Sequence, residues 1–181
     1  TPWNFPSTMI TRKCAPALAV GCTVVIKPAP QDPLAVIKLG EVLNEVFPPG
    51  VVNVIVGSSP EVGAALVDSK DVNMISFTGS SQVGAKIMEA GGKTMKRLLM
   101  ELGGKGALIM TEDCDVQAAV GGIASVWGFH SGQICTAPTR VICHREIYEP
   151  TIEALSAVSE FMTLGDAREE STLVGPVITE T

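Results

Sequence analysis

Apolar runs of four to six residues, rich in Val, Ile and Leu, alternate with longer stretches whose apolar residues recur every three or four positions. Such runs are typical of buried strands, and such stretches are typical of amphipathic helices. The predicted strands are residues 23–26, 51–56, 73–77, 98–102, 107–110 and 140–144. The predicted helices lie between residues 33 and 48, over 61–67, after Gly79, after Asp115 and over about 150–162.

This alternation indicates the fold class. Strands that are apolar on both faces, with helices between them, favour a mostly parallel sheet covered by helices on either side. The chain is therefore predicted to be an α/β protein of the doubly wound kind. In such a sheet, ligands bind beyond the carboxyl ends of the strands. The loops that follow strands are thus the places where a binding site is expected.

Composition excludes several classes of protein. The chain has 181 residues, with 13 Lys and Arg against 19 Asp and Glu, so its net charge is −6. Nucleic-acid binding would need a basic stripe, which is absent. The most apolar stretch, residues 19–26, is far shorter than the roughly 20 residues that a membrane helix needs. No nucleic-acid or membrane partner is expected.

The five cysteines form neither CxxC pairs nor the spacing of a disulfide framework, and no cluster of metal ligands is evident, so no metal is expected. This usage indicates a reducing, cytoplasmic setting. Cysteines in α/β cores are most often inert small hydrophobes. We interpret four of the cysteines in this way: Cys14, Cys22, Cys114 and Cys143.

Two segments could hold a phosphorylated ligand. Residues 77–84, FTGSSQVG, run from a strand through a glycine turn into a helix, whose free N–H groups suit a pyrophosphate. A tight turn without a ligand is the alternative. Lys27 directly follows a strand, where its ammonium could bond ribose hydroxyls or a phosphate. The alternative is a solvated lysine at a strand end.

Three further residues could do chemistry. Glu101 ends an apolar strand beside two glycines and has the profile of a general base, although an exposed Glu would look the same. Cys135 lies in a polar, glycine-containing loop, HSGQICTA, that could receive a substrate. His130 in the same loop suggests a Cys–His protease, but no protease signature surrounds the pair. The Asn4 amide could donate to an oxyanion, or could simply occupy a turn.

The order and spacing of these motifs resemble those of the NAD(P)-dependent aldehyde dehydrogenase superfamily over essentially the whole chain. The motifs are PWNFP at 2–6, Lys27-Pro28, FTG at 77–79 with Gly84, ELGGK at 101–105, and GQIC at 132–135. The resemblance implies a Rossmann-like NAD(P)-binding domain over 1–103, without its first strand. It also implies that residues 104–181 begin an α/β catalytic domain.

The resemblance further implies oxidation of an aldehyde to a carboxylic acid. Cys135 would be the nucleophile, Asn4 and the Cys135 backbone N–H would form the oxyanion hole, and Glu101 would activate water to hydrolyse the thioester. NAD or NADP would accept the hydride. The cofactor-binding residues would be Trp3, Lys27, Pro30, Gly57, Pro60, Thr78, Gly79, Ser80, Gly84 and Leu102.

Two departures from the family pattern stand out. Many NAD-preferring members carry Glu three residues after the lysine, whereas this chain has Pro30, so NADP is admissible. Family members are also longer at both ends, which predicts that the chain is an internal fragment that is inactive alone.

The resemblance also implies that the parent protein is a homodimer or homotetramer. Within the chain, the residues that could touch the substrate are Trp127, Phe129 and His130.

Two other functions remain open from the residues. In a CoA-acylating aldehyde dehydrogenase, a thiol rather than water would resolve the thioester; a Glu at position 101 favours hydrolysis. A binding or structural relative would keep the fold without catalysis. Retention of Asn4, Glu101 and Cys135 together argues against that alternative.

Overall fold

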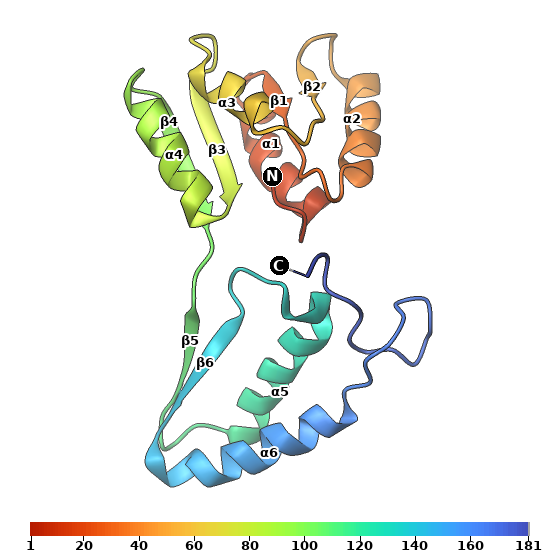
Figure 1. Cartoon of the computed structure of the whole chain (residues 1–181), viewed down its shortest axis with the longest axis vertical. Helices are drawn as coiled ribbons and strands as arrows, with labels where there is room; N and C mark the ends of the chain where they lie inside the picture. The colour runs from red at the N-terminus through yellow and green to blue at the C-terminus, as the bar shows by residue number, and fades with distance from the viewer. Residues whose placement is uncertain (181) are drawn as a thin grey trace. The chain divides into compact units, whose positions relative to one another are not determined.

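The computed structural model describes residues 1–180, and the chain divides into two compact units, Thr1–Gly103 and Gly104–Thr181. Both units combine α-helices with pairs of parallel strands (Figure 1). The α/β class predicted from the sequence is therefore confirmed. The first unit contains α1 (Pro6–Ala19), β1 (Val24–Ile26), α2 (Leu34–Val46), β2 (Val52–Val54), α3 (Pro60–Asp68), β3 (Met74–Gly79), α4 (Ser81–Gly92) and β4 (Arg97–Leu102).

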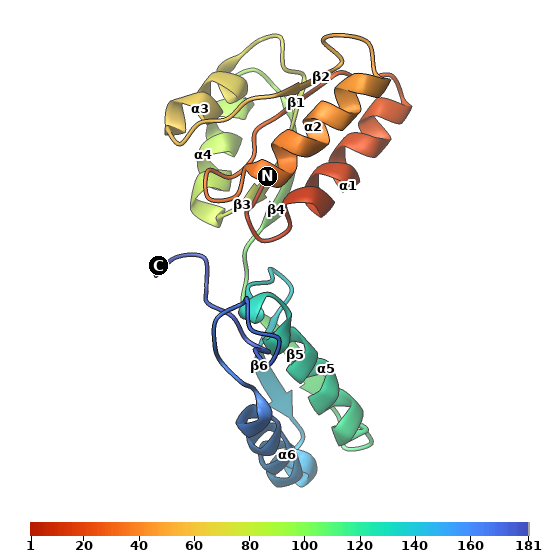
Figure 2. The same ribbon diagram turned by 90° about the vertical axis from the view of Figure 1, so that its right-hand side faces the viewer.

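The strands of the first unit form two parallel pairs, β1 with β2 and β3 with β4. Within this unit, α1 and α2 lie on one side of the strands and α3 and α4 on the other (Figure 2). The sequence predicted a mostly parallel sheet whose first strand is missing. Both pairs are parallel, and among the described residues no ladder of hydrogen bonds joins one pair to the other.

Helix α1 was not predicted from the sequence. It begins with Pro6 at its first position, where the missing N–H costs nothing, and continues through Pro16 in its last turn. An internal proline usually ends or kinks a helix, which hides the element from pattern analysis. Met9, Ile10 and Cys14 form its buried face.

The core of the first unit surrounds β1 and β2. Ile10 and Val36 are fully buried, and they pack with Cys14, Ile26 and Val52. Because this cluster joins α1, α2 and both strands, it fixes the end of β1, after which Lys27 follows. Burying side chains of this size stabilises a fold by about 1.5–3 kcal/mol each.

The pairing of β3 with β4 decides which residues share a face. Thr78 is the register partner of Glu101. Ideal Cβ atoms on Gly84 and Gly91 of α4 would lie 2.6 Å and 3.2 Å from Cδ2 of Leu102 and Leu98, respectively. Alternate β4 residues therefore face α4, and Glu101 faces the opposite side.

The second unit contains β5 (Gly106–Met110), α5 (Val116–Gly128), the 3₁₀ helix η1 (Phe129–Gly132), β6 (Pro138–Cys143), the 3₁₀ helix η2 (Arg145–Ile147) and α6 (Tyr148–Phe161). Strands β5 and β6 pair in parallel. Among the described residues of this unit, the buried ones are Met110, Val120, Ile123 and Thr151. Asp115 caps α5 by accepting a hydrogen bond from the Ala118 N–H at 3.0 Å.

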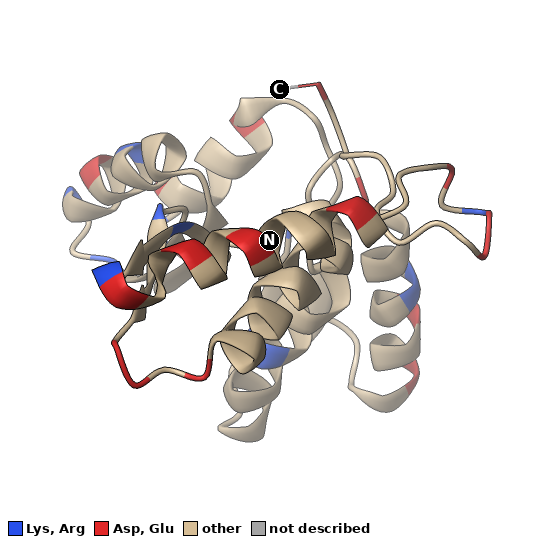
Figure 3. Ribbon diagram, turned by 90° about the horizontal axis from the view of Figure 1, so that it is seen from below, with Lys and Arg blue, Asp and Glu red and all other residues tan. Residues whose placement is uncertain are grey.

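Charged residues of both signs lie along the helices and loops (Figure 3). Lys38 and Glu41 pair at 2.8 Å on α2, and Arg168 and Asp166 pair at 2.5 Å in the second unit. These pairs are exposed, so each contributes little stability. Among the helices of residues 1–180, none is long and apolar enough to cross a membrane.

Candidate functional site

Glu101 lies on the face of β4 that is turned away from α4. Its register partner Thr78 is buried, and the Thr78 Oγ1 has no hydrogen-bond partner within the described part of the chain. Ser76 shares this face of β3 because it lies two residues before Thr78. From α1, the Nζ of Lys13 donates a hydrogen bond of 2.8 Å to the Ser76 Oγ. The structure thus groups a carboxylate, two hydroxyls and an ammonium on one face.

Lys13 was not singled out from the sequence. Burial lowers its pKa below the ordinary lysine value, although the charge of Glu101 acts in the opposite direction. The signal lay in the spacing, because Lys13 follows the buried Ile10 and Met9 by three and four residues and therefore lies on the buried stripe of α1. It was missed because α1 itself was not predicted.

The start of α4 has the form expected of a phosphate-binding turn. Ser80 is the N-cap and its Oγ accepts a hydrogen bond from the Val83 N–H at 3.3 Å. Gly84 lets the helix approach β4, because a Cβ there would lie 2.6 Å from Leu102 Cδ2. The helix is 12 residues long, so its positive end can attract an anion.

Lys27 and Pro30 lie on the segment that follows β1. The Nζ of Lys27 is 3.3 Å from the carbonyl oxygen of Pro28, to which it donates, and the Lys27 carbonyl accepts a hydrogen bond from the Thr1 amino group at 2.8 Å. Pro28 and Ala29 are buried, whereas Pro30 is exposed. Lys27 is half-buried at the end of the strand, as the sequence suggested.

The segment Gly57 to Pro60 leads into α3. Ser59 caps this helix by accepting a hydrogen bond from the Glu61 N–H at 3.2 Å, and Pro60 occupies its first turn. A Cβ on Gly57 would lie 2.8 Å from Val62 Cγ2, so this position favours glycine. Both Gly57 and Pro60 therefore have structural roles that do not depend on a ligand.

Trp3 and Asn4 lie in the bend that precedes α1, and both are half-buried. The next residue, Phe5, is the N-cap of α1, and its carbonyl accepts a hydrogen bond from the Met9 N–H at 3.0 Å. The start of α1 thus holds Asn4 in place. This position belongs to the same unit as Glu101.

Cys135 belongs to the second unit, where it is exposed and forms no disulfide. It occupies a turn from Ile134 to Ala137 that is closed by a hydrogen bond of 3.1 Å from the Ala137 N–H to the Ile134 carbonyl. This turn precedes β6. Cys135 therefore lies in the loop between η1 and the amino end of β6.

The backbone before Cys135 is strained. His130 and Ser131 have φ values of 51° and 54°, and Gly132 has a φ of 74°. Residues with a Cβ adopt this left-handed region at a cost of about 1–3 kcal/mol each. The ring of His130 lies 4.4 Å from that of Phe129 between centroids. Such strain often marks a functional loop.

The other cysteines follow the prediction only in part. Cys14 is buried, and burial raises the pKa of its thiol. Cys22 is exposed, because it follows a turn through Gly21, whose φ is 84°. Its interpretation as a core residue was therefore wrong. The Sγ of Cys143 lies 3.4 Å from the Thr151 Oγ1, within hydrogen-bond distance.

A cavity of about 300 Å³ lies within the second unit, between α5 and the segment that leads into β6. Ile123, Val126 and Trp127 line it from the helix, and Gly132 and Ala137 line it beside the Cys135 turn. Trp127 therefore faces a hollow next to this turn. Phe129 is 55% exposed.

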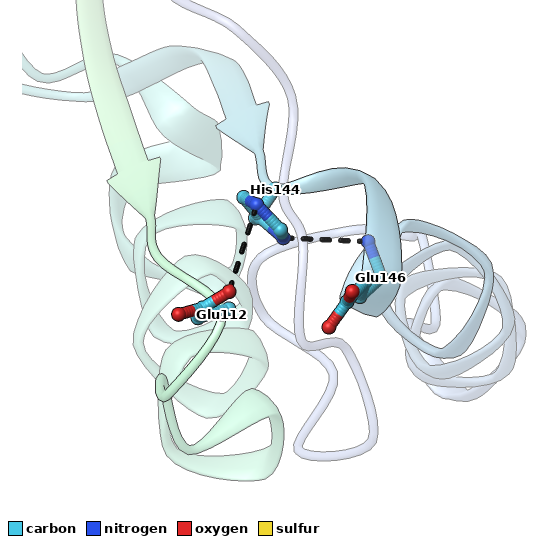
Figure 4. Close-up of side chains that lie close together, drawn as sticks. All are labelled: Glu112, His144 and Glu146. Carbon is cyan, nitrogen blue, oxygen red and sulfur yellow. Dashed lines mark hydrogen bonds and ion pairs between the residues drawn. The ribbon is translucent and has the colours of Figure 1, made fainter.

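Glu112, His144 and Glu146 form a cluster at the carboxyl ends of β5 and β6 (Figure 4). The His144 Nδ1 accepts the Glu146 N–H at 3.5 Å, while its Nε2 lies 3.8 Å from Glu112 Oε2. The imidazole caps η2 through its Nδ1.

Comparison with known proteins gives a consistent result. A family model described as the aldehyde dehydrogenase family matches residues 1–181. The mitochondrial succinate-semialdehyde dehydrogenase of Arabidopsis thaliana is 43% identical over 181 residues, covering 99% of this chain and 34% of the relative. The phenylacetaldehyde dehydrogenase of Pseudomonas fluorescens is 42% identical over 180 residues, covering 99% and 36%, respectively.

Solved structures give the same answer. The betaine aldehyde dehydrogenase of Staphylococcus aureus in complex with NAD⁺ has a TM-score of 0.93 and 37% identity, over 99% of this chain and 36% of that one. An NADP-dependent enzyme of E. coli has a TM-score of 0.94 and 38% identity, over 99% and 37%. The chain spans about a third of the length of the relatives it matches.

Proposed function

The chain belongs to the aldehyde dehydrogenase family, and from this premise we propose that the complete protein oxidises an aldehyde to a carboxylic acid with NAD⁺ or NADP⁺. The observation that carries the proposal is the match of the family model to residues 1–181. In this proposal, Thr1–Gly103 is the cofactor-binding part and Gly104–Thr181 begins the catalytic part.

The residues of the first unit suit a dinucleotide. The amino end of α4, with Gly79, Ser80 and Gly84, would hold the pyrophosphate, because N–H groups and a positive dipole end meet there. Lys27 would bond the adenosine ribose. The buried Thr78 hydroxyl, which lacks a partner among the described residues, is a further group that a ligand could satisfy. Trp3, Pro30, Gly57, Pro60 and Leu102 complete the proposed set.

Cys135 is the proposed nucleophile. The exposed turn makes its sulfur accessible, and its thiolate would attack the aldehyde carbon to form a tetrahedral thiohemiacetal. The Asn4 side-chain amide and the Cys135 backbone N–H would donate to the resulting oxyanion. Bound NAD(P)⁺ supplies the hydride acceptor, and loss of the hydride leaves a thioester on Cys135.

Glu101 is the proposed general base for the second half of the reaction. Its carboxylate would take a proton from water, and the resulting hydroxide would attack the thioester carbonyl. The carbon–sulfur bond then breaks, which releases the carboxylic acid and regenerates the thiolate of Cys135. Glu101 is exposed on β4, which is the alternative that the sequence left open, and water can reach its carboxylate there.

The cofactor, setting and assembly are proposed as follows. Pro30 is exposed and carries no charge that would repel a 2′-phosphate, so we propose that NADP⁺ as well as NAD⁺ is used. Cysteines without disulfides fit a reducing compartment such as the cytoplasm. The complete protein is proposed to be a homodimer or homotetramer.

The experiment that tests this function is an absorbance assay of NAD(P)H formation. The complete protein and its Cys135→Ala variant would be supplied with aliphatic and aryl aldehydes and with NAD⁺ or NADP⁺ separately. Turnover that disappears in the variant supports the proposal. Absence of turnover with every pair, or product formation only with added CoA, would contradict it.

A further inference from the structure

The loop that carries Cys135 adopts a conformation that its own sequence does not favour. His130 and Ser131 are consecutive left-handed residues with a Cβ, and Gly132 extends the run. Such a run does not persist unless surrounding contacts hold it. The structure should therefore contain groups that fasten this loop.

Gln133 makes contacts on both sides of its side-chain amide. Its Nε2 donates a hydrogen bond of 2.8 Å to the His130 carbonyl, which also accepts the Gln133 backbone N–H at 3.0 Å. Its Oε1 accepts the backbone N–H of Ile178 at 2.9 Å. One amide thus closes the left-handed run and ties it to a segment 45 residues away.

A second contact joins the same two segments. The Ser131 Oγ donates a hydrogen bond of 2.7 Å to the Gly175 carbonyl. The segment that receives these bonds is itself held, because Leu164 and Val174 form a bridge and the Gly165 N–H donates to the Val174 carbonyl at 3.2 Å. The anchor of the loop is therefore part of the second unit's backbone structure.

We propose that Gln133 is a positioning residue that sets the orientation of Cys135 for attack on the aldehyde. Cys135 is two residues beyond Gln133, and the turn that contains it begins at Ile134. Loss of the Gln133 contacts releases the left-handed run and lets the turn shift. This inference rests on the proposed role of Cys135 as nucleophile.

The expected effect is on the first chemical step. A shift of the nucleophile by about 1 Å can cost about a hundredfold in rate. Gln133→Met keeps the length of the side chain but removes both contacts, and Gln133→Ala removes the side chain. Both variants of the complete protein should form the first equivalent of NAD(P)H about 10- to 100-fold more slowly, with the aldehyde KM changed by less than about threefold.

Two further measurements separate positioning from loss of structure. Hydrogen exchange should become faster in peptides that cover residues 129–137 and 175–178, but not in those that cover β5. Gln133→Glu can donate to the His130 carbonyl only when it is protonated. Its first-turnover rate relative to wild type should therefore rise as the pH falls from about 7 to about 5, while the Gln133→Met ratio stays constant.

The matched control is Gln117→Ala, because Gln117 is an exposed glutamine on α5 and is expected to leave all readouts unchanged. A first turnover within about twofold of wild type in Gln133→Met would overturn the proposal, even if hydrogen exchange increased. If Gln133→Ala does not fold, the first-turnover rate of Gln133→Met alone tests the proposal against the same twofold limit. Turnover that persists in Cys135→Ala would instead refute the proposed nucleophile, which distinguishes the two failures.

Discussion

Lys13 on α1 donates a hydrogen bond of 2.8 Å to Ser76 on β3, and this contact places an ammonium on the face of the β3–β4 pair that also carries Glu101. Burial lowers the pKa of Lys13, whereas the charge of Glu101 raises it. The pKa of Lys13 should therefore respond to the charge of Glu101.

Removal of the Glu101 charge should lower the pKa of Lys13 further. In a Glu101→Gln variant of the complete protein, the half-buried ammonium loses a negative charge that supports it, while its partial burial is unchanged. The measurement is a pH titration of Lys13 by NMR after reductive ¹³C-methylation. Glu41→Gln is the control, because Glu41 pairs with Lys38 on α2 and should leave Lys13 unaffected. An unchanged titration midpoint of Lys13 in Glu101→Gln would contradict the placement of Lys13 and Glu101 on the same face of the β3–β4 pair.

Lys13 also affects how the free energy of unfolding changes with pH. A lysine whose pKa is lower in the folded state binds fewer protons folded than unfolded, so its contribution makes the protein more stable as the pH rises between the two pKa values. Lys13→Met should remove this contribution. The free energy of unfolding is measured by urea unfolding at a series of pH values approaching 10.5. Over this range it should increase less with pH, or decrease more, in Lys13→Met than in wild type. An identical slope would contradict the burial of Lys13.

Two helix glycines should respond oppositely to alanine. A Cβ on Gly40 of α2 would lie 2.5 Å from Cγ2 of Val54, a stiff β-branched side chain, whereas one on Gly63 of α3 meets no atom within 4 Å. Gly40→Ala should destabilise by about 1–3 kcal/mol. Gly63→Ala should stabilise by about 0.5–1 kcal/mol. Chemical denaturation of both variants checks this, and equal effects would refute the close packing of α2 on β2.

Ser80 allows the cap of α4 to be separated from anion binding. Asp is as good an N-cap as Ser and interacts favourably with the helix dipole, so Ser80→Asp should keep the stability of the protein. The added charge should repel a pyrophosphate and weaken NAD⁺ binding by at least about tenfold. Ser80→Ala should instead lose about 0.5–2 kcal/mol of stability. Thermal unfolding and a fluorescence titration with NAD⁺ check the two effects. An NAD⁺ affinity equal to wild type in Ser80→Asp would exclude the amino end of α4 as the pyrophosphate-binding site.

Pro30 offers a test of cofactor choice. A carboxylate at this exposed position could accept from a ribose 2′-hydroxyl and would repel a 2′-phosphate. Pro30→Glu should therefore raise the NADP⁺ KM by at least about tenfold and leave the NAD⁺ KM unchanged or lower. Gln31→Glu is a neighbouring control. An NADP⁺ KM in the wild-type protein already orders of magnitude above that for NAD⁺ would refute the proposed dual use.

The sequence predicted the strands and most helices of the fold, because their signals are local. Residues 61–67, for example, fall within α3, and 107–110 within β5. Helix α1 was missed because Pro16 interrupts its pattern. Which strands pair could not be predicted, since pairing between distant strands leaves no mark in either strand alone.

The candidate site was predictable to a similar extent. Local motifs indicated Glu101, Ser80 and Cys135. The contacts of Lys13 with Ser76 and of Gln133 with Ile178 join residues 63 and 45 positions apart. No period or motif in the sequence encodes such contacts, because they depend on the folded backbone.

The most direct test of the account is to trap the covalent intermediate. The complete protein with Glu101→Gln would be mixed with an aldehyde and NAD(P)⁺, quenched in acid and digested, and the peptide that contains Cys135 would be weighed by mass spectrometry. The account predicts one equivalent of NAD(P)H and an acyl group on Cys135, absent from the Cys114 and Cys143 peptides. NAD(P)H formation without any acyl group on Cys135, or undiminished steady turnover in Glu101→Gln, would contradict it.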